Sequence, residues 1–369
     1  MRYIWESNDW PNFTWDSKKL LTLTANAAHH QGRLLGRMDG LGFDLQDQAQ
    51  LHALTDDVVN SSEIEGEDLP ENLVRSSIAR RLGMKNIKDL VPSPRDVDSV
   101  VAMMTDATAH YDKPLTQERL FEWHRDLFDA DTTIKHIVIG RYRLETMAVV
   151  SGPYGNERTH FEAPPAYRLH DEMNRFLKWF EKPHKYTSPL LHAGIAHLWF
   201  VTIHPFDDGN GRIARAITDM ALARAENNNR RFYSMSKQIL KERNAYYDML
   251  EQTQKGECDI TPWLEWFLNC LIRAIKNADS TVGTVLMKAK FWQRNAEESL
   301  NERQIKMLNM LLDGFEGKLK TDKWAKITKC SPDTALRDIN DLIKRRILKK
   351  DSGGGRSTSY SLAPIEVGS

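Results

Sequence analysis

The twelve residues from His204 to Arg215 connect two apolar stretches, and they restrict the fold and chemistry of this chain more than any other segment. They read His-Pro-Phe-Asp-Asp-Gly-Asn-Gly-Arg-Ile-Ala-Arg. Residues 195–203 before them are apolar except at two positions, and apolar residues recur at helical spacing from Ile213 to Ala221. The segment is therefore predicted to be a loop that opens a helix, and the unpaired N–H groups of a helix N-terminus attract anions.

The side chains of this loop suit a bound chain of phosphates. Gly209 and Gly211 lack a Cβ atom, so the backbone can approach a phosphate closely. Asp208 would repel that phosphate unless a cation lay between them, and Mg²⁺ is the usual cation. Arg212 and Arg215 are three residues apart on the predicted helix, share a face, and can hold further phosphate oxygens.

The segment resembles the signature of the Fic family, His-x-Phe-x-[Asp/Glu]-Gly-Asn-Gly-Arg-x-x-Arg. All of its specified positions are filled, by His204, Phe206, Asp208, Gly209, Asn210, Gly211, Arg212 and Arg215. The resemblance implies transfer of AMP from ATP to Tyr, Ser or Thr hydroxyls of target proteins and of the chain itself. Family members that phosphorylate carry Lys in place of the second loop glycine, so Gly211 favours nucleotidyl transfer.

The resemblance also implies a role for each loop residue. His204, the only loop group that titrates near neutrality, would deprotonate the attacking hydroxyl. Asp208 would hold Mg²⁺ on the α- and β-phosphates, and the backbone of the Gly-Asn-Gly turn would form an anion hole. Arg212 would bind the γ-phosphate, and Arg215 would support the β-phosphate.

Residues 61–66, Ser-Ser-Glu-Ile-Glu-Gly, form a second motif far upstream. Apolar residues before them predict an amphipathic helix that ends near Gly66, because glycine favours a helix C-terminus. Ser61 and Glu65 are four residues apart and face the same way. The segment resembles the family's inhibitory pattern [Ser/Thr]-x-x-x-Glu-[Gly/Asn], which implies that Glu65 pairs with Arg212 and inhibits transfer within the chain. The alternative is a helix end whose acidic side chains are solvated.

Residues 146–151 favour a β-strand, and the turn signal that begins at Gly152 predicts a hairpin among the helices. The resemblance implies that Val149, Val150, Ser151 and Gly152 belong to a flap, which aligns the target segment by strand addition. A plain connecting loop is the alternative.

A helix is predicted from Ser236 to Gln254, and it carries the adjacent Tyr246 and Tyr247. The resemblance implies that this pair lies near the adenine. His197 lies in an apolar segment without metal-ligand spacing, so it is interpreted as a packing residue.

The sequence indicates three parts. Residues 1–92 are predicted to be a helical domain that carries the inhibitory helix, and residues 93–290 the Fic catalytic core. Residues 295–369 predict three helices and two short strands around a Ser-Gly-Gly-Gly-Arg turn, in the order of a winged helix-turn-helix, with Ser331 and Pro332 opening the third helix. Basic residues on that third helix fit contacts with DNA phosphates. A protein-interaction module of the same fold is an equally open interpretation.

Composition adds three expectations. The formal net charge is +0, so the charge of the whole chain implies no polyanionic partner. The chain has 3 cysteines and no CxxC pair, which is typical of reduced thiols in a cytoplasmic protein. No apolar run approaches the length that spans a membrane.

We therefore expect a mainly α-helical protein with a Fic core, a small β-hairpin flap and a C-terminal winged helix. The expected function is Mg²⁺-dependent protein adenylylation with ATP as substrate, inhibited by Glu65. Two alternatives stay open: removal of AMP from modified proteins with Glu65 orienting a water, and a DNA-binding transcriptional regulator whose Fic domain senses a nucleotide. The resemblance alone implies that the core forms a homodimer.

Overall fold

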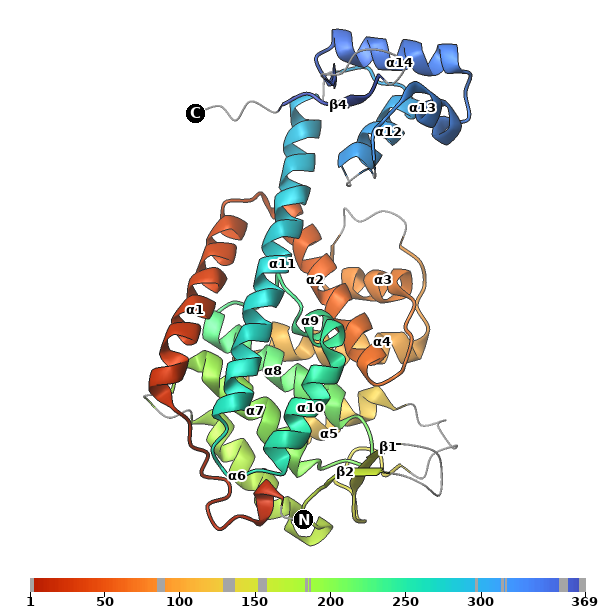
Figure 1. Cartoon of the computed structure of the whole chain (residues 1–369). Helices are drawn as coiled ribbons and strands as arrows, with labels where there is room; N and C mark the ends of the chain where they lie inside the picture. Colours follow the sequence, from red (N-terminus) through yellow and green to blue (C-terminus); the bar gives the residue numbers. More distant parts are fainter. Residues whose placement is uncertain are drawn as a thin grey trace. The chain divides into compact units, whose positions relative to one another are not determined.

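The computed structural model describes residues 3–84, 90–128, 137–151, 158–182, 185, 187–295, 298–312, 315, 317–351 and 358–364, apart from the side chains at 281, 282, 284–286, 289 and 290. The chain forms two compact units, Met1–Asp279 and Ser280–Ser369 (Figure 1). Residues 1–92, predicted as a separate domain, thus share one unit with most of the predicted core. Within the described part of the chain, no helix is long and apolar enough to cross a bilayer.

The first unit is almost entirely helical, as expected from the sequence. Its α-helices are α1 (Ser17–Asp39), α2 (Phe43–Ile64), α3 (Glu71–Arg81), α4 (Arg95–Ala109), α5 (Gln117–Leu127), α6 (Leu169–Glu181), α7 (Pro189–Ile203), α8 (Asn210–Glu226), α9 (Met235–Lys241), α10 (Arg243–Gln254) and α11 (Thr261–Arg294), which continues into the second unit. Two short 3-10 helices, Ile4–Glu6 and Ala166–Arg168, precede α1 and α6.

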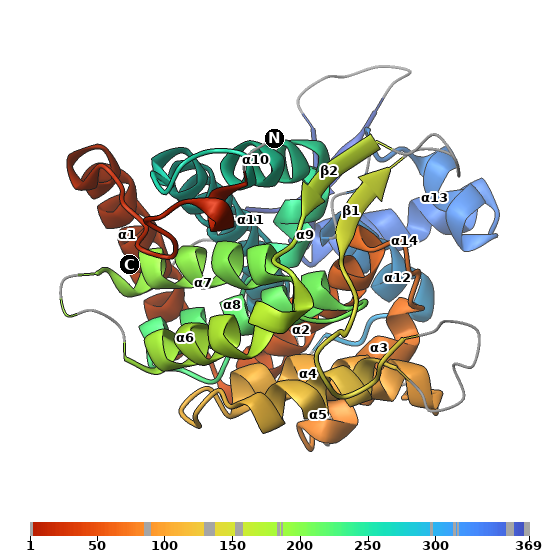
Figure 2. The same ribbon diagram turned by 90° about the horizontal axis from the view of Figure 1, so that it is seen from below.

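Helices α7 and α8 form the centre of this unit. Every residue of α7 from Leu190 to Ile203 is buried, and a helix that is apolar all round belongs in the interior. Figure 2 shows α7 between α6 and α10, with α8 running beside it. The six residues 204–209 that join α7 to α8 are therefore held at both ends by buried helices.

Helix α2 packs on this centre and ends as predicted. Glu65 is its C-cap residue, and Gly66 follows with φ +86°, a left-handed conformation that glycine adopts easily. Two turns before this end, the buried carboxylate of Asp57 accepts hydrogen bonds from Ser234 Oγ at 2.6 Å and from the Ser236 amide at 3.0 Å. These bonds fix α2 to the start of α9.

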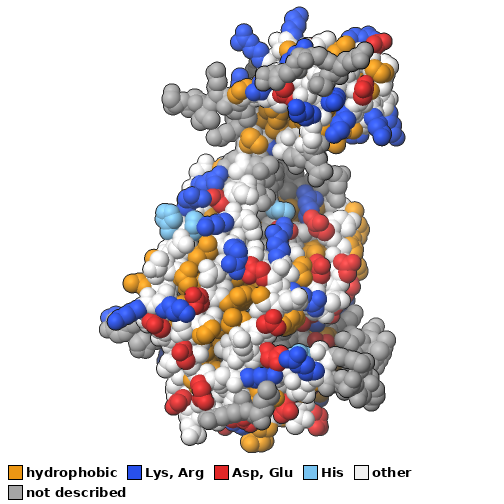
Figure 3. All heavy atoms as spheres, in the orientation of Figure 1, with side chains coloured by type: hydrophobic (Ala, Val, Ile, Leu, Met, Phe, Trp, Pro, Cys, Tyr) orange, Lys and Arg blue, Asp and Glu red, His pale blue; other side chains and the backbone are white. Residues whose placement is uncertain are grey.

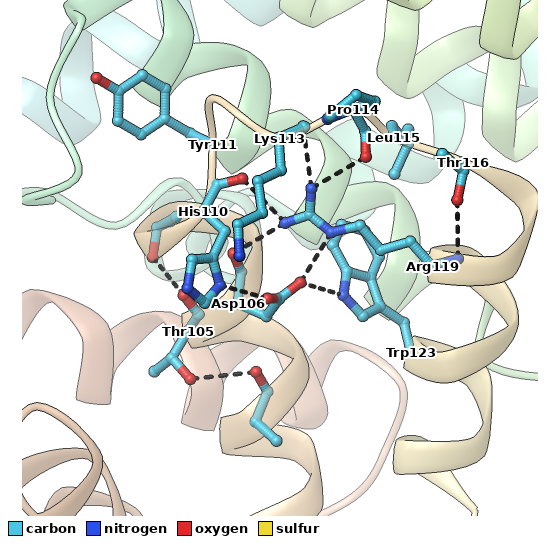
Figure 4. Close-up of polar contacts among 12 residues, drawn as sticks. Thr105, Asp106, His110, Tyr111, Lys113, Pro114, Leu115, Thr116, Arg119 and Trp123 are labelled. Atoms are coloured by element: carbon cyan, nitrogen blue, oxygen red, sulfur yellow. Dashed lines mark hydrogen bonds and ion pairs between the residues drawn. The ribbon is translucent and has the colours of Figure 1, made fainter.

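Helix α5 is tied to α4 by a cluster of polar contacts (Figure 4). The Asp106 carboxylate accepts hydrogen bonds from Arg119 Nε at 2.9 Å and from Trp123 Nε1 at 2.8 Å. Thr116 caps α5, as predicted, by accepting the Arg119 amide at 3.2 Å. The end of α5 thereby has a fixed place, and a Cβ atom added to Gly209 would meet Leu127 Cδ1 at 3.0 Å.

The helix predicted from Ser236 to Gln254 is two helices, α9 and α10. They meet at Glu242, whose φ of −115° and ψ of 25° are not helical. The Glu242 carboxylate accepts two hydrogen bonds of 2.6 Å from Arg273 of α11. Helical periodicity in the sequence did not reveal this break, because the residues on both sides keep helical spacing.

The predicted hairpin is confirmed. Strands β1 (Ala148–Ser151) and β2 (Arg158–Glu162) pair antiparallel, with an irregular register after Val149. All of β1 is exposed, including Val149 and Val150, and among the described residues β1 pairs with no strand other than β2. Gly152 lies outside the described residues.

The second unit continues with α12 (Glu302–Leu312), α13 (Thr321–Thr328) and α14 (Pro332–Lys344), followed by β3 (Leu348–Lys350) and β4 (Tyr360–Leu362). Its own core contains Trp324, Ile339 and Leu348. Strands β3 and β4 pair antiparallel, and Leu319 adds a single bridge to Tyr360. The Ser-Gly-Gly-Gly-Arg turn, 352–356, is outside the described residues, and the winged helix stays a prediction.

Candidate active site

His204 lies where α7 ends, in a left-handed conformation with φ 51°. Its Nδ1–H donates to the Val201 carbonyl at 3.1 Å, which leaves Nε2 as the nitrogen that can accept a proton. Burial lowers the pKa of the imidazole, and nearby Arg143 lowers it further against the opposing effect of the Val201 bond. His204 is therefore neutral at pH 7, as a general base must be.

The loop after His204 is held rigidly by Asn210 and Phe206. The Asn210 amide group accepts the Phe206 N–H at 3.0 Å and donates to the Phe206 carbonyl at 2.8 Å. The Phe206 ring is fully buried and stacks on His124 with 4.3 Å between ring centroids. The side chain of Asn210 thus shapes the loop, and only its backbone is available to the predicted anion hole.

A carboxylate already lies at the N-terminus of α8. A Cβ atom added to Gly211 would be 2.0 Å from Glu65 Oε1, so Glu65 covers the backbone at the second loop glycine. The N-terminus of a helix favours negative charge. The Glu65 carboxylate therefore takes up part of the space that the sequence predicts for a phosphate.

Arg215 is the arginine that Glu65 holds. Arg215 Nη2 pairs with Glu65 Oε1 at 2.7 Å and also donates to the Ser61 carbonyl at 2.8 Å, while its Nε donates to Ser61 Oγ at 2.8 Å. The Arg215 side chain is buried, and its Nη1 has no hydrogen-bond partner among the described residues. The predicted common face of Ser61 and Glu65 is thus observed, and it faces Arg215.

The predicted pairing of Glu65 with Arg212 is wrong, because Arg212 has another partner. Arg212 Nη1 pairs with Glu67 at 2.5 Å, beyond the turn that Gly66 makes, and its Nη2 lies 3.8 Å from Asp208. Arg212 and Arg215 are three residues apart, slightly less than one helical turn, so their side chains point in different directions. Arg215 reaches α2, and Arg212 reaches the segment that follows α2. Nothing in the sequence pointed to Glu67, because it lies just outside the motif of residues 61–66.

Asp208 is half-exposed beside these arginines. Its Oδ1 accepts the Gly209 amide at 2.6 Å. Among the described residues, no group of three or more His, Cys, Asp and Glu side chains could hold a metal ion. Mg²⁺ usually takes only one or two carboxylates and completes its shell with phosphates and water, so Asp208 fits a magnesium ion that arrives with a nucleotide.

The two tyrosines predicted near the adenine have different environments. Tyr246 is buried, and its hydroxyl bonds His197 Nε2 at 2.9 Å, while His197 Nδ1 bonds Thr218 Oγ1 at 2.9 Å. This arrangement confirms His197 as a packing residue. Tyr247 is 39% exposed and donates to the Ile64 carbonyl at 3.3 Å. It is therefore the tyrosine of the pair that the adenine of a nucleotide could contact.

Arg143 stabilises the backbone around His204, and no sequence motif predicted this role. Its side chain is buried, with Nε donating to the His204 carbonyl at 2.8 Å and Nη2 to the Pro164 carbonyl at 2.5 Å. Its backbone amide donates to the Pro205 carbonyl at 2.9 Å. Arg143 therefore connects the turn at His204 with the chain that follows the hairpin.

A polar chain also joins the hairpin to α10. His160 Nδ1 donates to the Glu251 carboxylate at 2.6 Å, and His160 Nε2 accepts the Ser151 hydroxyl at 2.5 Å. Arg158 donates to the same carboxylate at 3.0 Å. Hydrogen bonds from Lys255 and His160 lower the pKa of Glu251 to about 2, so the Glu251 carboxylate stays ionised at neutral pH.

Comparison with known proteins agrees with this geometry. The sequence pattern of the Fic/DOC family matches residues 114–222, which include the whole loop from His204 to Arg215. The chain carries a Fic domain. Residues 3–84, which include α1 to α3, match a family described as a domain of unknown function (DUF4172).

Curated relatives of the chain are named protein adenylyltransferase Fic. The chain is 26% identical to that of Nematostella vectensis over 223 residues, which is 59% of this chain and 47% of the relative. It is 35% identical to that of Drosophila yakuba over 99 residues, 27% of this chain and 18% of the relative. The chain thus matches less than half the length of either relative.

Solved structures confirm the fold. A Fic family protein from Desulfovibrio desulfuricans G20 is 20% identical with a TM-score of 0.54, covering 93% of this chain and 96% of that one. A Fic domain containing signaling protein from Bacteroides thetaiotaomicron VPI-5482 is 19% identical with a TM-score of 0.53, covering 70% and 97%. The predicted mainly α-helical Fic fold with a small hairpin is therefore correct.

Proposed function

We propose that this Fic protein transfers AMP from ATP to Tyr, Ser or Thr hydroxyls of target proteins and of itself. One observation carries the proposal: a neutral His204, with Nε2 open to a proton, lies beside a helix N-terminus flanked by two buried arginines. Each of these guanidinium groups keeps one buried N–H without a hydrogen-bond partner among the described residues, Nε of Arg212 and Nη1 of Arg215. Buried donors of this kind fit phosphate oxygens. The names of the curated relatives support the same activity.

The reaction follows from the placement of these groups. His204 Nε2 takes the proton of the target hydroxyl, whose oxygen attacks the α-phosphorus of ATP. The bond from the α-phosphorus to the oxygen that bridges to the β-phosphate breaks, and pyrophosphate leaves. The N–H groups at the start of α8, with Arg212 and Arg215, stabilise the phosphate charge. Asp208 would hold Mg²⁺, which neutralises phosphate charge when bound.

Regulation within the chain is part of the proposal. Glu65 occupies Arg215 and covers Gly211, while Glu67 occupies Arg212. Two carboxylates thereby hold the donors that the phosphates of ATP need, and inhibition requires no second molecule. Self-association of the core, which only the family resemblance suggests, is a further proposal that light scattering at micromolar concentration would test.

The decisive experiment uses ATP labelled at either end of its phosphate chain. With the Glu65→Gly chain, label from [α-³²P]ATP is expected to stay on protein after denaturation, and label from [γ-³²P]ATP is not. This outcome follows from breakage of the bond between the α- and β-phosphates. Retention of the γ-label would instead identify a kinase, and retention of neither would refute the proposed transfer.

Removing the candidate metal ligand should abolish the dependence on magnesium. In the Glu65→Gly background, Asp208→Ala is expected to lower the labelling rate by about 100-fold or more, because charged phosphates lose their bridging cation. The measurement is the labelling rate across a titration of MgCl₂. Asp248→Ala, which removes an exposed carboxylate from α10, is the matched control and should change nothing. An unchanged magnesium dependence in Asp208→Ala would contradict the assignment.

The pH dependence of the rate should report the depressed pKa of His204. Because burial lowers this pKa, the neutral base persists below the ordinary value of 6.5 and is lost only as the pH falls through the lowered pKa. The acid limb of kcat/KM for ATP, which reports groups of the free chain, should therefore have its midpoint below pH 6.5. His160→Gln should leave that midpoint in place. A midpoint above 6.5 would mean that another group controls the rate.

Glu67→Gln should tighten nucleotide binding without any change at Glu65. The substitution keeps the shape of the side chain and removes the charge that occupies Arg212. Since Glu67 is partly exposed, its ion pair is worth about 1 kcal/mol, so ATP should bind roughly fivefold more tightly by calorimetry. Glu63→Gln, an equal loss of charge at an exposed position of α2, serves as the control. Equal affinities for the two variants would show that Glu67 does not restrict the site.

A further inference from the structure

The zero net charge of the chain conceals two oppositely charged units. Residues 280–369 contain 17 Lys and Arg against 11 Asp and Glu, a formal charge of +6, which leaves −6 on residues 1–279. Figure 3 shows Lys and Arg side chains over the part of the second unit that α13 forms. A strongly basic small unit is typical of proteins that bind a polyanion, so the expectation from the whole-chain charge does not apply to this unit.

Two of the three acidic side chains of α14, Asp338 and Asp341, pair with other residues of the unit, whereas Asp333 in its first turn is exposed. Asp338 is buried and accepts hydrogen bonds from Arg303 at 2.8 Å and from Asn301 at 2.9 Å. Asp341 pairs with Arg345 at 2.9 Å. In contrast, basic side chains are exposed on and around α13 and α14, namely Lys320, Lys323, Lys326, Lys329, Arg337 and Lys344. Exposed basic side chains therefore outnumber the exposed acids of these two helices, Asp322 and Asp333.

Helices α13 and α14 have the connection of a helix-turn-helix. Only three residues join them: Lys329 is left-handed with φ 51°, and Ser331 caps α14 by accepting the Thr334 amide at 3.2 Å. One face of α14 is buried in the core. The opposite side, which we call the outer face, is exposed and consists of Leu336, Arg337, Asn340 and Lys344. A second helix with an exposed outer face is the element that reads DNA in this motif.

We propose that the outer face of α14 binds in the major groove of duplex DNA. Arg337 and Asn340 are three residues apart and adjacent on the helix surface, and neither has a polar partner among the described residues. Arginine pairs with guanine edges and asparagine with adenine edges, while the 40% exposed Leu336 suits a thymine methyl group. Lys326 and Lys329, before α14, supply phosphate contacts.

The choice of duplex DNA over other polyanions depends on the mixture of side chains. An anionic membrane attracts a basic surface through positive charge, for which lysines would suffice. The outer face instead places an amide and an apolar side chain beside its arginine. An α-helix also fits the width of the B-DNA major groove, whereas the deep, narrow groove of duplex RNA excludes side chains.

The first test measures binding by the full-length wild-type chain without nucleotide. Fluorescence anisotropy with a labelled 24-base-pair duplex of mixed sequence should detect binding at 50 mM NaCl that weakens steeply at 200 mM. The double variant Lys326→Glu with Lys329→Glu should weaken binding at least tenfold. The slope of log K against log salt concentration should also fall by the amount expected for the loss of about two phosphate contacts. Lys18→Glu with Lys178→Glu makes the same charge change at exposed sites of the first unit and should have no such effect.

The second test examines base recognition. Duplexes selected from a random library by the wild-type chain should share a short sequence. For that sequence, Arg337→Ala should lose about 5- to 150-fold in affinity, while binding to unselected DNA falls much less. The side chain at 337 is exposed, so this variant keeps the fold. Failure to bind duplex DNA at 50 mM salt would refute the proposal. Equal binding to duplex RNA or to vesicles with anionic lipids would also refute it. Neither outcome bears on AMP transfer, because no nucleotide is present.

Discussion

Replacing His204 by alanine should abolish AMP transfer while ATP still binds. In the Glu65→Gly background, we expect His204→Ala to lower the labelling rate by about 10²- to 10⁴-fold, the usual cost of losing a general base. The groups proposed to bind the phosphates are the N–H groups at the start of α8 and the side chains of Arg212 and Arg215. The substitution of His204 leaves them unchanged. The affinity for ATP, measured by calorimetry, should therefore change little.

The structure supplies a matched control for this base. His160 belongs to the hairpin, where it bonds Ser151 and Glu251, and His160→Gln removes an imidazole without touching the loop. It should keep most of the chemical rate at saturating target, although target binding weakens if the hairpin loosens. A His204→Ala chain that labels itself at the parental rate would show that the proton leaves by another route.

Glu65→Gly is expected to give the largest gain of activity that a single substitution can produce in this chain. Its carboxylate both pairs with Arg215 and covers the backbone at Gly211, so its loss frees two parts of the phosphate site together. Coupling of this kind usually amounts to about 5- to 150-fold, and we expect the labelling rate to rise within that range. The measurement compares wild-type and variant chains at equal ATP.

The corrected pairing gives this prediction a sharp internal test. Arg215→Ala in the Glu65→Gly chain should cancel the gain, because the freed guanidinium is the group through which activation acts. Glu63→Gly, at an exposed position of the same helix end, controls for any loosening of α2. A Glu65→Gly chain with unchanged labelling would disprove inhibition by Glu65. If that chain instead loses the ability to remove AMP from a modified protein, the hydrolytic alternative is favoured.

The sequence predicted the loop far better than its surroundings. The loop between α7 and α8, the helix end at Gly66 and the cap at Thr116 depend on local sequence, and each lies near its predicted place. The partner of each arginine was not predictable, because it depends on how α2 lies across α8. The spacing of Ser61 and Glu65 shows that they share a helix face, but it does not show whether that face contacts Arg212 or Arg215.

The residues that sequence analysis missed act through long-range contacts. The buried Arg143 reaches the carbonyls of His204 and Pro164, and nothing in the neighbouring sequence distinguishes it from the arginines at the surface. Tyr246 and Tyr247 look equivalent in sequence, yet one is buried against His197 and the other is open. The break at Glu242 likewise comes from a contact with α11, far along the chain.

The buried bonds of Asp57 have a consequence for how the proposed activity can be switched on. Helix α2, which carries Ser61, is also part of the packed interior of the first unit. Its buried Asp57 accepts hydrogen bonds from Ser234 and Ser236. Proteolytic removal of α2 would therefore expose apolar surface and cost stability, and would not yield a free active core. An activating signal has to displace only the final turn and the residues up to Glu67. The anchored portion stays in place, so the contacts of Glu65 and Glu67 with the two arginines can re-form without refolding.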